Sequence, residues 1–187
     1  QMTRTDAAGR QQVISQPYCS STALRREGLN EYSFEAGAVR QDYGQRSNAY
    51  GDVAAAATFR RGVSDRFTAE AHAEGRSGNG PRAVGLGGAW QTGELGVVTA
   101  AVAAGADRDG SGWLGGVGFE RNGSLLTVFA RAQYASESFA QLGSDSFEER
   151  PRQQLFGGMG LNFGASGSLQ LAYGQQGFWG ASSVETL

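Results

Sequence analysis

The sequence predicts an all-β fold, an antiparallel up-and-down meander, and three observations carry that prediction. Apolar and polar residues alternate along many segments, and a side-chain period of two is typical of a strand with one apolar and one polar face. Glycine is abundant (30 residues) and proline is scarce (3 residues), which suits strands broken by tight turns. Short and long connections alternate along the chain, as they do in outer-membrane barrels. We therefore expect the meander to be part of a transmembrane β-barrel.

Residues 31–41 show the alternation. Tyr32 and Phe34 fall on one side of an extended chain, and Ser33 and Glu35 fall on the other. A helix would instead place its apolar residues at spacings of three and four. About nine strands are expected, and lengths of roughly ten residues suit a tilted crossing of a bilayer. The expected strands are residues 31–41, 51–61, 67–74, 82–90, 94–104, 113–121, 125–136, 153–163 and 168–178.

The connections between these strands differ in length and composition. Asn122-Gly123 predicts a type I′ hairpin, because these residues accept positive φ angles. Longer polar loops are rich in glycine, serine and charged residues. The short turns are expected at residues 62–65, 91–93, 122–123 and 164–167, and the long loops at residues 75–81, 106–112 and 137–151.

Charge and cysteine content exclude several classes of function. The 16 basic residues are all arginine, they are scattered, and the net charge is -2, so nothing predicts nucleic-acid binding. The single Cys19 cannot form an internal disulfide. No apolar run reaches the ~18–20 residues that a membrane helix needs. The mean hydropathy of -0.37 still fits a membrane barrel, in which only every second residue faces lipid.

Glu70, His72 and Glu74 share one face of an expected strand and are the best candidates for a metal site. Neighbours on the same face of a strand lie roughly 6.5–7 Å apart, so the three do not converge without help from another strand. A solvated wall is the favoured interpretation, and no metal or other cofactor is expected.

Other motifs also favour a structural role over catalysis. Residues 107–112 begin like a calcium loop, but Gly118 stands where the bidentate glutamate belongs. The glycine runs at residues 85–88 and 157–160 lack the third glycine of a dinucleotide loop and open no helix. His72 is the only histidine, and no nucleophile-elbow motif is present. The sequence therefore does not predict an enzyme.

A run of matches in order carries a family resemblance. Pro17-Tyr18-x-Ser20-Ser21 is followed by Leu24-Arg25-x-Glu27-Gly28 and then by Tyr32-Ser33, Ala36-Gly37, Arg40, Tyr50-Gly51-Asp52 and residues 62–70. This run resembles the signature of the fimbrial outer-membrane ushers, at the point where the chain leaves the plug domain and re-enters the barrel. Cys19 departs from the signature.

The resemblance implies a fold, a location and partners. Residues 1–16 would be the end of the plug and the connection into the barrel, and residues 17–187 a segment of the barrel wall. Ushers lie in the bacterial outer membrane, where pilus subunits arrive with a periplasmic chaperone and are polymerised as they are secreted. The family uses no nucleotide or other cofactor. The chain starts without an initiator methionine or a visible signal peptide, as expected of an excised or processed segment.

In such a wall, one face of each strand lines a wet lumen and the other meets outer-membrane lipid. The expected lumen-facing residues are Ser33, Glu35, Glu70, His72, Glu74, Arg131 and Gln133. The expected lipid-facing residues are Phe34, Phe67, Leu86, Trp113, Val128 and Leu171.

A charge introduced at Val128 is expected to harm membrane assembly more than the same charge at Thr127, because only residue 128 is assigned to lipid. The amount of each variant recovered from outer membranes measures the difference. Equal recovery of the two variants contradicts the assignment of faces.

Two other interpretations remain open. The chain could be a self-contained small outer-membrane barrel, acting as an adhesin or a porin-like protein, although its ending Val184-Glu185-Thr186-Leu187 lacks the usual terminal aromatic residue. It could also be a soluble β-sandwich that acts as a binding module, but such a fold would carry large residues on its apolar faces, and the many alanines there disfavour it. About nine strands by themselves would leave two unpaired edges, through which copies could associate.

Overall fold

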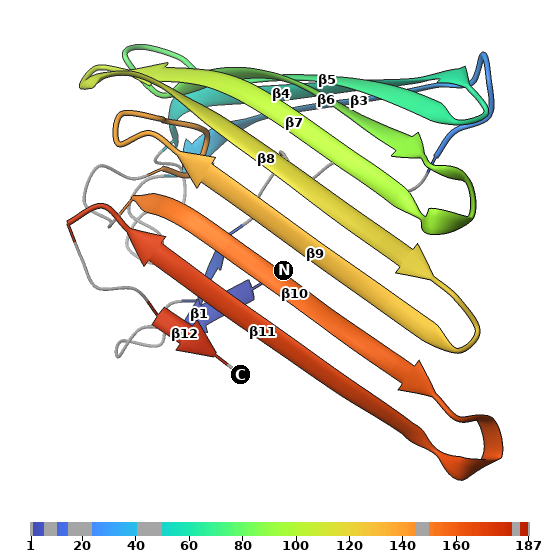
Figure 1. The fold of residues 1–187 in the computed structure, drawn as a ribbon. Helices are drawn as coiled ribbons and strands as arrows, with labels where there is room; N and C mark the ends of the chain where they lie inside the picture. Colours follow the sequence, from blue (N-terminus) through green and yellow to red (C-terminus); the bar gives the residue numbers. More distant parts are fainter. Residues whose placement is uncertain are drawn as a thin grey trace.

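The structure is a computed structural model that describes residues 2–5, 11–14, 24–40, 50–144, 150–180 and 184–186. Two antiparallel sheets are present. β1 (Met2–Thr5) pairs with β2 (Gln11–Ile14), and ten further strands form one sheet in which every strand pairs with its neighbours in sequence (Figure 1). The predicted all-β, up-and-down antiparallel fold is therefore confirmed. Among the described residues, no helix is long and apolar enough to cross a membrane.

The ten strands of the large sheet are antiparallel to their neighbours, and two of the connections contain a short 3₁₀ turn. The strands are β3 (Asn30–Arg40), β4 (Tyr50–Ser64), β5 (Phe67–Arg76), β6 (Arg82–Gln91), β7 (Val97–Asp107), β8 (Gly110–Asn122), β9 (Leu126–Ala135), β10 (Pro151–Asn162), β11 (Ser168–Phe178) and β12 (Val184–Thr186), and the turns are η1 (Gly93–Leu95) and η2 (Gly164–Ser166).

The predicted loop at residues 106–112 is wrong. β7 continues to Asp107 and pairs there with Gly110, so only residues 108–109 form the turn. The side chain of Asp107 accepts a hydrogen bond of 2.8 Å from the N–H of Asp109 and closes the turn. Glycine, serine and charged residues made the stretch look like a loop. In the strand pair, Gly105 lies opposite Gly112 and Ala106 lies opposite Ser111.

Three smaller differences concern strand ends and strand number. The turn predicted at residues 62–65 is formed by residues 65–66, because β4 continues past Gly62 through a register shift to Ser64. The strand predicted from residue 94 begins at Val97, after η1. Strands β1, β2 and β12 were not predicted.

The two ends of the large sheet carry different connections. At one end, named here the short-turn end, the links are residues 65–66, 92–96, 123–125 and 163–167. At the other, named the loop end, residues 77–81 connect β5 to β6 and residues 136–150 connect β9 to β10. The turn at residues 108–109 is also at the loop end, so the expected alternation in length has an exception there.

The pairing register separates the side chains onto two faces, because directly opposed residues in an antiparallel pair project to the same side. Phe34 pairs with Ala57, which pairs with Ala73, on the apolar face. Glu35 pairs with Ala56, which pairs with Glu74, on the polar face. The same division continues through every strand pair to β11.

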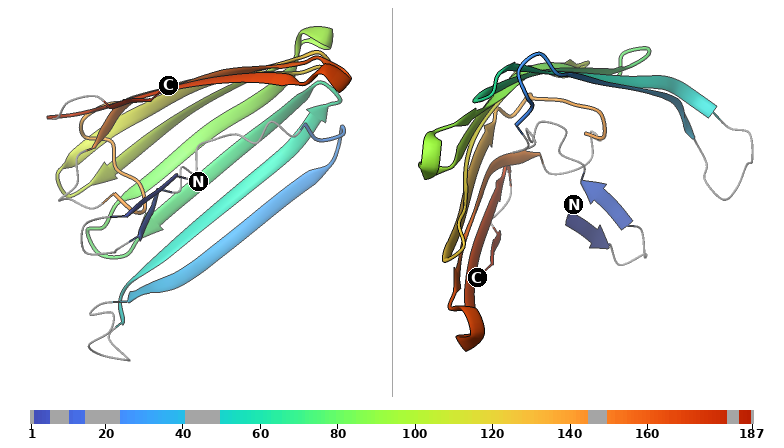
Figure 2. Two further views of the ribbon diagram at one scale, coloured as in Figure 1. Left: turned by 90° about the horizontal axis from the view of Figure 1, so that it is seen from below. Right: turned by 90° about the vertical axis from the view of Figure 1, so that its right-hand side faces the viewer.

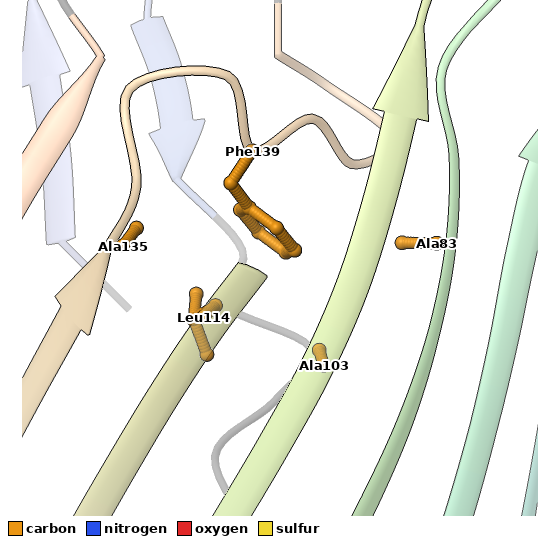
Figure 3. Packing of buried hydrophobic residues seen from close by; sticks show 5 residues of the cluster. All are labelled: Ala83, Ala103, Leu114, Ala135 and Phe139. Carbon is orange, nitrogen blue, oxygen red and sulfur yellow. The ribbon is translucent and has the colours of Figure 1, made fainter. Parts of the chain in front are cut away.

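The buried core lies on the polar face, at the loop end. Phe139, from the connection after β9, packs with Ala83, Ala103, Leu114 and Ala135 (Figure 3). The sheet is curved, and the connection that holds Phe139 lies on its concave side (Figure 2). The polar face is therefore the concave one. The convex apolar face is left exposed, and Leu86 keeps 65% of its surface accessible there.

Candidate functional site

The concave polar face is the candidate functional site. The register places Ser33, Glu35, Glu70, His72, Glu74, Arg131 and Gln133 on this face. It places Phe34, Phe67, Leu86, Trp113, Val128 and Leu171 on the opposite, apolar face. The two sets are thus separated as the alternation predicts. That one set faces a lumen and the other lipid remains a prediction.

An ion-pair ladder crosses the polar face near the short-turn end. Glu31 accepts a hydrogen bond of 2.7 Å from Nε of Arg25, and Nη1 of Arg60 lies 3.7 Å from its other oxygen. Nε of Arg60 donates to Glu70 at 2.5 Å. Positive and negative side chains therefore alternate across the face, from the segment before β3 through β3 and β4 to β5. The carboxylate of Glu70 is paired with a cation, and this leaves it poorly placed to share a metal with His72.

A second polar network joins β4, β5 and the connection after β9. Oγ1 of Thr58 lies 2.7 Å from Nδ1 of His72, and Nε2 of His72 lies 3.2 Å from Oε2 of Glu74. The N–H of Leu142 donates to Oε1 of Glu74 at 2.7 Å. The His72 and Glu74 side chains are only 8% and 4% exposed. Burial makes such bonds costly to lose, because an unpaired buried group keeps its desolvation penalty.

Residues 136–144, named here the inward segment, lie across the polar face. The N–H of Trp113 donates a hydrogen bond to Oγ of Ser136. The N–H of Ser136 donates in turn to the carbonyl of Trp113. A Cβ added to Gly105 would overlap the carbonyl of Ala140, and one added to Gly112 would overlap the N–H of Phe139. The segment can therefore approach the sheet only where glycines face each other.

Sequence reasoning missed the inward segment and the partners Thr58 and Arg60. Residues 137–151 were predicted to be a long polar loop, and their charged residues supported that reading. A signal was present in Phe139-Ala140 and Leu142, apolar residues in a polar stretch. The burial of Phe139 and Ala140 could be anticipated only with the register that brings Gly105 opposite Gly112.

Replacing Glu74 by alanine is expected to release the inward segment, because the N–H of Leu142 then loses its acceptor. Chymotrypsin, which cuts after Phe139 and Leu142, should cleave the segment roughly tenfold faster, as expected for the loss of ~1.4 kcal/mol from one buried hydrogen bond. Glu35→Ala, an exposed carboxylate on the same face, is the matched control and should cleave at the wild-type rate. Unchanged cleavage of Glu74→Ala contradicts the anchoring role.

Residues 24–29, named here the crossing segment, hold the end of β4 and β5. The N–H of Gly28 donates to the carbonyl of Gly62 at 2.8 Å, the N–H of Arg25 donates to Oγ1 of Thr68 at 2.8 Å, and the N–H of Glu27 donates to Asp65 at 3.2 Å. Two of the stretches that carry the family resemblance, residues 24–28 and 62–70, therefore contact each other.

The remaining predicted residues of the polar face are distributed along it. Ser33 and Glu35 are exposed on β3. Arg131 lies opposite Gly118 and Phe156, and Gln133 lies opposite Gly116 and Gln154. Within the described part of the chain, no group of three or more histidine, cysteine, aspartate or glutamate residues could hold a metal ion.

The architecture defines a class of protein. A meander of long antiparallel strands, with a polar concave face and an exposed apolar convex face, has the construction of a membrane β-barrel wall. A sandwich core would instead require a second sheet on the apolar face, but Leu86, Val102 and Val117 of that face stay 65%, 63% and 59% exposed.

Among solved structures, the chain is similar in fold to the PapC usher in the cryo-EM structure of the E. coli P pilus tip assembly intermediate PapC-PapD-PapK-PapG. The TM-score is 0.70 at 16% sequence identity, and the similarity covers 98% of this chain and 24% of that chain. This chain therefore spans about a quarter of the length of PapC and has the fold of part of its barrel. No protein-family model and no curated protein matches the sequence.

Proposed function

We propose that this chain forms part of the wall of an outer-membrane usher pore, through which chaperone-delivered pilus subunits are assembled and secreted. The observation that carries the proposal is the fold similarity to the PapC usher over 98% of the chain. The separation of polar and apolar residues onto the two faces supports it. The proposed partners are pilus subunits bound to a periplasmic chaperone, and the proposed location is the bacterial outer membrane.

The polar face suits the passage of a folded protein. Its charged groups on β4 and β5 are paired with one another, as in Arg60–Glu70, so they offer few unpaired charges to a passing subunit. On β6 to β8 the same face is built largely from glycine and alanine, including Gly87, Ala101 and Gly116 in one row. Small residues leave the wall smooth and provide few contacts to which a subunit could adhere.

The apolar face suits contact with lipid tails. Leu86, Val102 and Val117 are 65%, 63% and 59% exposed in the middle of the sheet. A contiguous apolar surface of this kind is rarely left facing water. In a bilayer it requires no covering partner, since lipid replaces water along the whole convex face.

Cysteine labelling tests the two faces directly. In a Cys19→Ser background, Glu35→Cys and Phe34→Cys place a thiol on adjacent, exposed positions of β3 that project to opposite faces. A hydrophilic, membrane-impermeant maleimide is expected to label residue 35 through a water-filled lumen and to leave residue 34 unlabelled. Equal labelling of both positions contradicts the proposed wall.

An immunoblot of native outer membranes, with an antibody raised against this chain, tests the usher assignment. A band far above 19.6 kDa is expected if the chain is part of a large usher. A band near that mass would identify a self-contained small barrel and overturn the assignment.

A further inference from the structure

A row of aromatic rings lies at the loop end of the apolar face. The ring centroids of Trp113 and Tyr134 are 5.5 Å apart, and Tyr134 meets Trp179 edge to face at 6.3 Å and 80°. Trp113 and Tyr134 belong to neighbouring strands, and the register places both on the apolar face. They remain 54% and 38% exposed. The row therefore presents ring surface to whatever surrounds the sheet.

Two backbone contacts fix the last ring of this row. Nε1 of Trp179 donates to the carbonyl of Ala135 at 3.1 Å, and its backbone N–H donates to the carbonyl of Arg150 at 2.9 Å. The indole is thus tied to the end of β9 and to the residue before β10. A ring held at both its backbone and its side chain loses little further freedom when a ligand binds beside it.

Arg152 completes the cluster. Its guanidinium carbon lies 5.3 Å from the centroid of the Trp179 ring, within the range of a cation–π contact. Within the described part of the chain, no carboxylate pairs with Arg152. The acidic residues of the nearby β7–β8 turn form ion pairs with Arg150, which lies 3.0 Å from Asp107 and 3.9 Å from Asp109. Arg152 therefore presents an exposed positive charge that no carboxylate among the described residues compensates.

We propose that Trp113, Tyr134, Trp179 and Arg152 form a binding site for the phosphate-bearing headgroup of an anionic membrane lipid. Tryptophan and tyrosine are the residues that settle at the level of lipid headgroups, with the ring body in the apolar layer. A guanidinium matches a phosphate with two parallel hydrogen bonds, and that of Arg152 lies within cation–π distance of the Trp179 ring. The charge complements an anionic headgroup, and the position at the end of the apolar face matches its depth. The inference rests on the proposed membrane setting of the chain.

Native mass spectrometry of the protein at its natural length tests the site, with phosphatidylglycerol as the anionic probe and phosphatidylcholine as the zwitterionic one. The wild-type protein is expected to retain phosphatidylglycerol in preference. Arg152→Gln is expected to lower that preference about fivefold, the usual effect of one basic residue near an anionic headgroup. Arg121→Gln is the matched control. Arg121 is an exposed arginine on the same face, opposite Val128 at the short-turn end, and its loss should leave the preference unchanged.

Two results overturn the site. One is wild-type lipid preference in Arg152→Gln, and the other is an equal loss in Arg121→Gln, which would reflect surface charge alone. Lipids brominated on their acyl chains separate this inference from the proposed function. Quenching of tryptophan fluorescence in both variants, without a difference in lipid preference, rejects the headgroup site and retains the membrane wall. Absence of quenching rejects the membrane setting itself.

Discussion

Replacing Leu86 by arginine is expected to remove most of the protein from the outer membrane. Leu86 is 65% exposed on the apolar face, between Ala71 and Val102 in the middle of the sheet. An arginine at the lipid-facing midplane of a barrel costs about 2–4 kcal/mol, which is a large share of the stability of an ordinary domain. The amount of heat-modifiable, folded protein in purified outer membranes measures the effect.

Ala101→Arg is the matched control for Leu86→Arg. Ala101 lies on the next strand at nearly the same height, but it projects from the polar face between Gly87 and Gly116. Those glycines leave room for the longer side chain, and a water-filled lumen would solvate its charge. Folded protein at close to the wild-type level is expected. A loss as large as that of Leu86→Arg would show that the apolar face is not the one in contact with lipid.

Replacing Gly62 by alanine is expected to lower the free energy of unfolding by about 2–4 kcal/mol, from overpacking together with lost hydrogen bonds. The new Cβ would overlap the carbonyl of Arg26 and crowd that of Arg25. The crossing segment would have to move away from the sheet. Its bonds from Gly28 to Gly62 and from Arg25 to Thr68 would then be lost.

Urea unfolding in detergent or bilayers, followed by tryptophan fluorescence, measures the change at Gly62. Gly37→Ala is the control, because Gly37 is a glycine of the same face on β3 whose added Cβ would meet nothing within 4 Å. It is expected to unfold within about 0.5 kcal/mol of the wild type. Equal stability of Gly62→Ala and Gly37→Ala contradicts the close approach of the crossing segment.

Most of the fold could be predicted from the sequence, because the strand signal is local. Alternation of Tyr32, Ser33, Phe34 and Glu35 defines a strand and its two faces without knowledge of any partner. The strand pairing could also be predicted, because in an up-and-down meander each strand pairs with the strands before and after it in the sequence. The prediction failed around residues 108–109, because the glycines and charged residues of that strand pair resemble those of a loop.

The contacts that organise the polar face could not be predicted in the same way. Glu74 and Leu142 are 68 residues apart, and nothing local relates a carboxylate on one strand to a backbone N–H in a distant connection. The same holds for Arg25 and Thr68, which are 43 residues apart. Sequence patterns place residues on faces, but bonds of this kind require the full register of the sheet.

The nearest-neighbour pairing of the strands has a consequence for the order of folding. Each hairpin of the large sheet can form from residues close together in the chain, so the entropic cost of closing each loop is small. The inward segment is different, because Phe139 packs against residues of β6, β7, β8 and β9 and Leu142 binds β5. The surface against which this segment packs is incomplete until those strands are paired. Residues 136–144 should therefore pack onto the polar face only after the strands have paired, as a late step of folding.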